Sequence, residues 1–138
     1  METSWNSWKS NYKIKDKNTY TYGTGKENKK YSITLLGDES SASASEVLIA
    51  GLRDNLKSTF IGKNTYGKGT VQELVTLSDN TQYKITVKRW LTPKGKCVSD
   101  TKGIKPDIDV DLNEEYYKTL DDNDDSQLQK AIEYIISK

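Results

Sequence analysis

A joint of small residues, Ser-Ala-Ser-Ala-Ser-Glu at 41–46, separates a short apolar run at 31–36 from a segment with helical periodicity. The apolar run lacks strict alternation, which predicts a buried strand. A helix is predicted over 44–57, where five apolar side chains recur at helical spacing: Val47, Leu48, Ile49, Leu52 and Leu56. Because 58–62 again has the composition of a strand, the order predicts a βαβ unit with a right-handed crossover in an α/β fold.

Beyond this unit, the sequence predicts a β-hairpin and a terminal helix. Two β-rich runs, 71–77 and 81–91, are joined by the turn signal Ser-Asp-Asn. Residues 112–126 are acidic and predict a solvated loop. Asp124 or Asp125 would cap the last helix, whose predicted buried stripe is Leu128, Ala131, Ile132 and Ile135. Residues 1–30 mix aromatic and polar residues and predict irregular structure with one edge hairpin.

The composition limits both the core and the partners. The chain has 138 residues, of which 33% are hydrophobic and 30% charged, and its mean hydropathy is −0.82. We therefore expect one domain, or part of one, with a thin core that relies on a missing upstream segment or on a homo-oligomer. A net charge of +1 gives no electrostatic footprint for nucleic acid. Neither a membrane span of ~20 apolar residues nor a targeting leader is predicted.

Two features of the residue inventory narrow the chemistry. The chain contains no histidine, which excludes a Ser-His-Asp triad, a Cys-His dyad and a His-ligated metal site. Its single cysteine, Cys97, has no partner for an internal disulfide and is predicted to be a small residue on a half-buried strand. No metal and no cofactor is therefore predicted, and nucleophilic catalysis would need a base other than imidazole.

The serine joint is suited to presenting a nucleophile, because a helix N-terminus directly behind it offers free N–H groups to an oxyanion. The alternative is a plain N-cap. Lys68 is the candidate base, since a desolvated lysine can lower its pKa from about 10.4 toward 7. Gln72 is a neutral residue that could orient the lysine. An extended chain would separate residues 68 and 72 by ~13 Å, whereas one helical turn brings them to ~6 Å. We therefore predict a bend or a single helical turn over 68–72. The alternative is a surface lysine in a glycine loop.

The loop at 62–70 also approaches a phosphate-binding P-loop, with Gly62, four residues, Gly67 and Lys68. That motif requires Ser or Thr after the lysine, whereas this chain has Gly69. A strand is predicted next, so the helix N-terminus that would hold phosphates is missing. The pattern does not favour nucleotide binding.

Four blocks of sequence resemble, in order, the C-terminal processing peptidases, also called tail-specific proteases. They are Gly-Asp-Glu-Ser-Ser-Ala-Ser-Ala-Ser-Glu at 37–46, Gly-Lys-Gly-Thr-Val-Gln at 67–72, Leu-Thr-Pro-Lys-Gly-Lys at 91–96 and Gly-Ile-Lys-Pro-Asp at 103–107. The closing segment at 126–131 resembles the last helix of that family. The resemblance covers about residues 31–138, and the spacing of Ser43 and Lys68 agrees with the family's serine-to-lysine separation.

The resemblance implies a role for each matched residue. Ser43 would be the nucleophile, Lys68 its general base and Gln72 the residue that positions the lysine, with the backbone N–H of Ala44 as half of the oxyanion hole. Family members cut protein substrates near their C-termini through an acyl-enzyme, work outside the cytoplasm and share the Clp protease/crotonase type of α/β fold.

Two parts of the family pattern have no match in the sequence. An upstream strand with an Asp-Leu-Arg…Gly-Gly motif, which completes the oxyanion hole, is not found, and neither is the substrate-recognising PDZ domain. Since one oxyanion donor is typically worth ~10²–10³ in rate, we expect this chain alone to be nearly inactive. Residues 31–138 would be the C-terminal portion of a serine endopeptidase domain. The alternative is a non-catalytic binding or assembly domain that keeps the fold.

Overall fold

The computed structural model describes residues 32–138, and the expectations for residues 1–30 fall outside that range. A mixed α/β arrangement is confirmed. In chain order the elements are β1 (Thr34–Gly37), α1 (Ala44–Leu56), β2 (Thr59–Gly62), β3 (Thr70–Thr76), β4 (Gln82–Arg89), β5 (Ile108–Asp109), α2 (Tyr116–Thr119) and α3 (Ser126–Ile136). The predicted βαβ unit is present, because β1 and β2 flank α1 and pair in parallel from Thr34 with Thr59 to Gly37 with Gly62.

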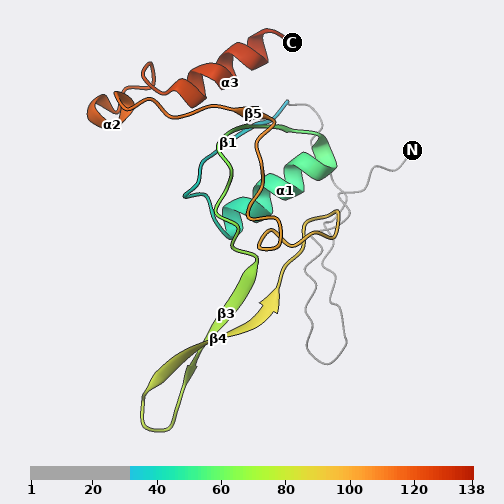
Figure 1. Ribbon diagram of the computed structural model, residues 1–138, viewed down its shortest axis with the longest axis vertical. Coiled ribbons are helices and arrows are strands. Elements are labelled where there is room, and N and C mark those ends of the chain that lie inside the picture. Colours follow the sequence, from blue (N-terminus) through green and yellow to red (C-terminus); the bar gives the residue numbers. More distant parts are fainter. Residues whose placement is uncertain (1–31) are drawn as a thin grey trace.

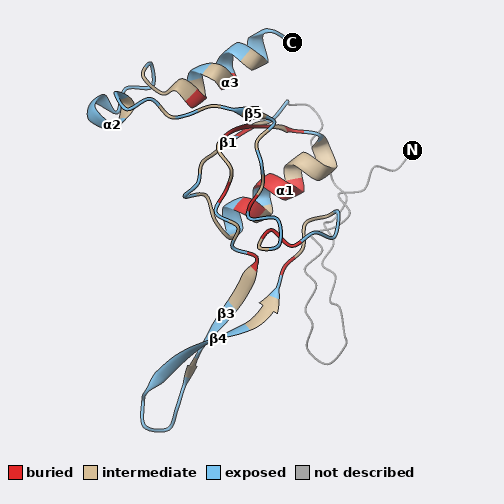
Figure 2. Ribbon diagram, in the orientation of Figure 1, coloured by how far each residue is buried: buried red, intermediate tan, exposed pale blue. Residues whose placement is uncertain are grey.

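A three-stranded parallel sheet in the order β1-β2-β5 forms the centre of the described fold. Figure 1 shows α1 on one side of this sheet and α3 on the other. The core lies between the sheet and α1, where Leu35, Ile49 and Phe60 pack together with Leu52 and Ile104. The helix stripe is only partly as predicted: Ile49 is buried, but Leu48 is 50% exposed. Figure 2 shows that the buried residues gather in α1, the sheet and the loops beside them.

The predicted hairpin is confirmed as the antiparallel pair β3 and β4, which projects away from the sheet (Figure 1). Its turn contains Asp79, whose carboxylate accepts hydrogen bonds from the Thr81 hydroxyl and backbone N–H. These bonds lower the pKa of Asp79 below its ordinary value. Most of the hairpin is exposed, including Leu74, Tyr83 and Ile85. Its stability therefore depends on pairing and on its attachment at the base, because a two-stranded ribbon alone is marginal in water.

The C-terminal part differs from the prediction in two details. The acidic stretch is not a plain loop, because it contains the short helix α2. In α3, Ala131 is buried as predicted, whereas Ile132 and Ile135 are largely exposed. The contact with the rest of the fold is partly polar, since the buried Gln127 side chain donates to the Val110 carbonyl at 3.0 Å. Within 32–138, no helix is long and apolar enough to cross a membrane.

The cap of α3 gives a direct stability test. The Asp125 carboxylate accepts a hydrogen bond from the Leu128 N–H at 2.9 Å, as a side chain at the N-cap should. We predict that Asp125→Ala lowers the free energy of unfolding by about 1 kcal/mol, measured by urea denaturation. Asp122→Ala removes the same charge near the same helix without removing the cap, and should change stability by less than half as much.

Candidate active site

The serines of the joint have different environments. The Ser41 hydroxyl donates to the Asp38 carboxylate at 2.9 Å and accepts from the Asp38 N–H at 3.0 Å, so it holds the turn after β1. Ser45 lies exposed in the first turn of α1. Ser43 occupies the N-cap position with φ 55° and ψ −111°. That backbone conformation is rarely adopted by a residue with a side chain.

The strain at Ser43 distinguishes it from a plain cap, because N-cap residues normally have unstrained extended backbones. Strained conformations of this kind typically cost about 1–3 kcal/mol and gather at active sites. A serine on a strained strand-to-helix turn is how α/β-hydrolases expose a nucleophile. Ala44 follows as the first residue of α1, a position whose N–H has no acceptor within the helix. The geometry therefore presents a hydroxyl and a free backbone donor side by side.

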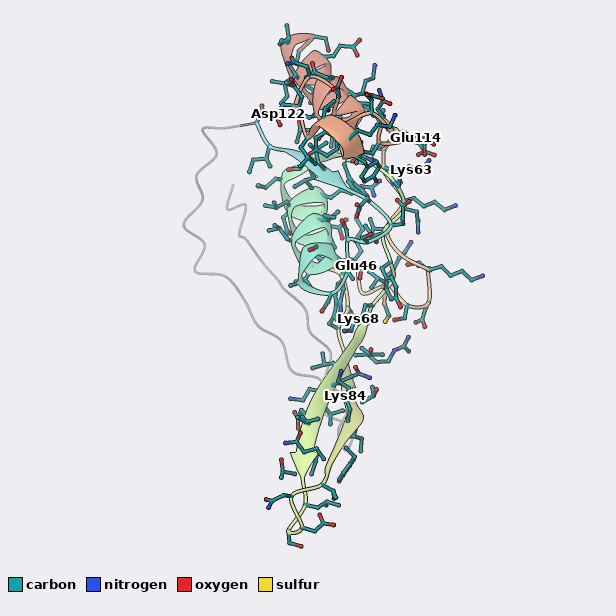
Figure 3. The ribbon with its side chains drawn as sticks, turned by 90° about the vertical axis from the view of Figure 1, so that its left-hand side faces the viewer. Glu46, Lys63, Lys68, Lys84, Glu114 and Asp122 are labelled. Atoms are coloured by element: carbon teal, nitrogen blue, oxygen red, sulfur yellow. The ribbon has the colours of Figure 1, made fainter. Side chains whose placement is uncertain are left out.

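A buried carboxylate connects this turn to the loop that carries Lys68. Glu46 is fully buried, and its Oε2 accepts from the Ser43 N–H at 2.9 Å and from the Lys68 N–H at 2.8 Å. Its Oε1 accepts from the Gly67 N–H and the Thr65 hydroxyl, both at 2.6 Å. Figure 3 shows Glu46 at one end of α1, close to Lys68 at the base of the hairpin. One charged group thus fixes the backbones of both candidate residues.

The sequence contains a local signal for the role of Glu46. Ser43 followed three residues later by Glu46, before an apolar run, matches a capping box, in which the glutamate binds back to the N-cap N–H. No local pattern indicates the other three donors to Glu46, the Thr65 hydroxyl and the Gly67 and Lys68 N–H groups, because they lie about twenty residues further along the chain. Thr65 extends the network, since its hydroxyl also accepts from the Ile104 N–H at 2.8 Å.

The four motif blocks meet around α1. The block at 103–107 contacts the helix through the ion pair of Asp107 with Arg53 and touches the Glu46 network through Thr65. The block at 91–96 is joined to α1 by the ion pair of Lys94 with Asp54, at 2.8 Å. The blocks at 37–46 and 67–72 share Glu46. Segments far apart in the sequence therefore form one structural unit.

The predicted contacts of Lys68 and Gln72 are not present. Of the two conformations predicted for 68–72, a bend or a helical turn, the helical turn is wrong: β3 begins at Thr70 and pairs with β4, with a bulge between Val71 and Gln72. The Gln72 amide donates to the Thr86 hydroxyl across the hairpin at 3.4 Å. Lys68 is exposed instead of buried in an apolar pocket, and within residues 32–138 its ammonium makes no hydrogen bond to Ser43.

A surface pocket of about 800 Å³ nevertheless brings several of these residues to one place. It is lined by Glu39, Ser40, Ala42, Tyr66, Gly67, Lys68, Thr70, Gln72 and Ser99. Lys68 and Gln72 both border it, and Ala42 is the neighbour of Ser43. The pocket is open to solvent and is lined by both polar and apolar groups.

The other candidate groups are structural. Cys97 is buried, but it lies in the loop after β4 and not on a strand as predicted. Its Sγ is 3.9 Å from the Gly69 carbonyl oxygen. Lys63 forms ion pairs with Asp109 and Asp111, which raise the pKa of its ammonium above its ordinary value and hold the end of β2 beside β5. In the part of the chain that the structure describes, no group of three or more cysteines and carboxylates could hold a metal ion.

Comparison with known proteins agrees with the motif blocks. The family model described as peptidase family S41 matches residues 4–110, which includes most of the segment before residue 31. The chain is 38% identical over 95 residues to "Carboxy-terminal processing protease CtpB" of Bacillus subtilis, covering 69% of this chain and 19% of that protein. It is 44% identical over 86 residues to "Probable CtpA-like serine protease" of Staphylococcus aureus, covering 62% and 17%. The chain thus spans less than a fifth of the length of these relatives.

A solved structure shows the same likeness. The photosystem II D1 C-terminal processing protease superposes with a TM-score of 0.53 at 38% identity, covering 56% of this chain and 20% of that one. The mixed α/β fold described above is therefore the one found in part of that protein.

Glu46→Gln tests the carboxylate as a structural hub. An amide has a single acceptor oxygen, so at least one of the backbone N–H groups that now bind Glu46 would face an NH₂ group. Each buried donor left unpaired costs about 1–3 kcal/mol, and we predict a loss of stability in that range, measured by urea denaturation. Glu39→Gln, at an exposed glutamate of the same segment, should have almost no effect.

Ser43→Gly tests the strain. Glycine adopts positive φ freely, so the substitution should relieve the strain of about 1–3 kcal/mol and lose about 0.5–1 kcal/mol through backbone entropy. We predict a net stabilisation of about 1 kcal/mol in thermal unfolding. Ser43→Ala keeps the strained backbone and should leave stability nearly unchanged. A Ser43→Gly protein less stable than the Ser43→Ala protein would contradict the assignment of strain.

Proposed function

Since the chain belongs to peptidase family S41, we propose that it carries the Ser/Lys part of a serine endopeptidase active site of the C-terminal processing type. The single observation that supports this most is the shared bonding of the Ser43 and Lys68 backbones to Glu46. A buried carboxylate that binds both backbones fixes the distance between the two residues, as a catalytic pair that acts together requires. The substrate would be a protein or peptide lying in the pocket beside Lys68.

In the proposed mechanism the Ser43 hydroxyl attacks the scissile carbonyl carbon while Lys68, in its neutral form, takes the hydroxyl proton. The N–H of Ala44 donates to the oxyanion as it develops. Lys68 then passes its proton to the leaving amine, which breaks the C–N bond and leaves an ester on Ser43. Water, deprotonated by Lys68, hydrolyses that ester. Gln72, which also borders the pocket, would position the lysine once substrate is bound.

The exposure of Lys68 is compatible with this role when substrate binding is considered. Lys68 and Gln72 both line the pocket, so a peptide filling it would remove water from the ammonium. Desolvation disfavours the charged form of a lysine, which is the change that a general base needs. Catalytic hydrogen bonds are also often long before substrate binds and shorten in the complex.

The same proposal includes the wider properties expected from the family resemblance. The fold would be of the Clp protease/crotonase type, with residues 31–138 as the C-terminal portion of the catalytic domain and a second oxyanion donor from an upstream segment. The protein would work outside the cytoplasm.

A second candidate function has one observation in its favour. In the described structure the Gln72 amide binds Thr86, not Lys68, and Lys68 is exposed. A non-catalytic binding or assembly domain that keeps the peptidase fold would not need the dyad to form. Such a domain would still bind peptides in the pocket.

Peptide hydrolysis separates the two functions. We predict that Ser43→Ala and Lys68→Ala each lower kcat/KM on the order of 10³-fold or more. The reason is that removing either member of a catalytic unit removes most of the rate enhancement of the whole unit. Ser45→Ala and Lys84→Ala are matched changes at exposed positions and should retain activity within about twofold. The assay uses the 138-residue chain and a chimera in which the upstream catalytic segment of a relative precedes it.

A chimera that cleaves peptides equally well with and without these substitutions would show that the dyad is wrong. A chimera that binds peptides but cleaves none would favour the binding domain.

A further inference from the structure

The three residues 67–69 have every backbone polar group satisfied, mostly by side chains. The N–H groups of Gly67 and Lys68 bind the Glu46 carboxylate, as described above. Two residues after β4, Trp90 and Ser99, bind the remaining groups: the Gly69 carbonyl accepts from the Trp90 backbone N–H, and side chains bind the others. This is unusual for a loop, where water commonly satisfies the backbone.

Trp90 binds directly to the residue proposed as the base. Its indole Nε1–H donates to the Lys68 carbonyl at 2.9 Å, and its backbone N–H donates to the next carbonyl, that of Gly69, at 3.0 Å. Trp90 is 7% exposed, so the indole is held by packing as well as by its hydrogen bond. A buried indole N–H must find an acceptor. Here that acceptor is the main chain of Lys68.

Ser99 bridges the two residues on either side of Lys68. Its Oγ accepts from the Gly69 N–H at 2.8 Å and donates to the Gly67 carbonyl at 3.0 Å. The approach is so close that a Cβ atom on Gly69 would lie 2.8 Å from this oxygen and 2.5 Å from Cys97 Sγ. Glycine at 69 is therefore required by the contact itself, because any side chain would displace Ser99.

The Lys68 side chain has no comparable restraint. Within residues 32–138, no hydrogen bond or ion pair is formed by its ammonium. The position of the ammonium over the pocket is consequently set by the backbone from which the side chain extends. That backbone is fixed by Glu46 on one side and by Trp90 and Ser99 on the other.

We propose that Trp90 and Ser99 are positioning residues for Lys68: they hold the backbone of 67–69 so that the lysine reaches the serine when substrate is bound. This inference rests on the proposed function for its catalytic consequence, and on the hydrogen bonds of Trp90 and Ser99 for the restraint of the 67–69 backbone. Small errors in placing a reacting group are costly, since a shift of about 1 Å can reduce a rate on the order of 10²-fold.

Trp90→Phe tests the role of the indole, because it removes the N–H and keeps an aromatic ring. In the 138-residue chain, NMR hydrogen exchange should show the Lys68 and Gly69 amides exchanging about tenfold faster or more, with Phe60 in β2 unaffected. In the peptide-cleaving chimera, kcat should fall about tenfold while KM stays within about twofold. Tyr83→Phe, at an exposed aromatic residue of β4, is the matched control and should change neither measurement.

Ser99→Ala should reproduce both effects, and Ser99→Thr, which keeps the hydroxyl, should restore exchange and kcat toward the original values. Unchanged exchange and unchanged kcat in Trp90→Phe and Ser99→Ala would overturn the inference while leaving the Ser/Lys dyad intact. If Trp90→Phe and Ser99→Ala speed exchange but Lys68→Ala hydrolyses peptides at the full rate, the proposed function is overturned. The catalytic role of Trp90 and Ser99 is then overturned with it. Loss of kcat with a normal KM and rescue by threonine would support both.

Discussion

The described structure depends on one buried negative charge. Glu46 lies in the first turn of α1 and accepts four hydrogen bonds, from the backbone N–H groups of Ser43, Gly67 and Lys68 and from the Thr65 hydroxyl. A buried carboxylate is costly unless its acceptor sites are filled, so the loop at 65–68 and the turn at 43 must both come to it. Hydrogen bonds to a charged group are also stronger than neutral ones. The carboxylate therefore sets the arrangement of two segments that the hydrophobic core does not reach.

The hydrogen bonds to Glu46 compensate for a small apolar core. The central cluster contains only Leu35, Ile49 and Phe60 in the described residues, with Leu52 and Ile104 beside it. Much of the remaining order comes from side chains that bind the backbone, such as Thr65, Ser99 and Trp90. Networks of this kind specify a unique geometry when every member is satisfied. A site that needs residues held to a fraction of an ångström benefits more from such directional bonds than from apolar packing.

The β3–β4 hairpin is attached directly to the hydrogen-bonded residues 67–69. It begins at Thr70, directly after residues 67–69, and ends just before Trp90, whose indole binds the Lys68 carbonyl. The base of the hairpin is thus anchored to the proposed site, while its far end extends into solvent. Both ends of the ribbon therefore attach to the 67–69 backbone: β3 follows these residues directly, and Trp90 after β4 binds them.

The sequence by itself determined the local elements and the order of the blocks. Helical periodicity after the serine joint gave α1, two β-rich runs joined by turn residues gave the β3–β4 hairpin, and Asp125 was one of two predicted caps. These features depend on neighbours within a few positions, which is why they can be read from the chain. Only the tertiary structure decided which groups meet: that Glu46 binds residues about twenty positions away, that Trp90 binds Lys68, and that pairing with β4 keeps Gln72 on an extended strand. Those contacts depend on how distant segments pack, and no local pattern encodes them.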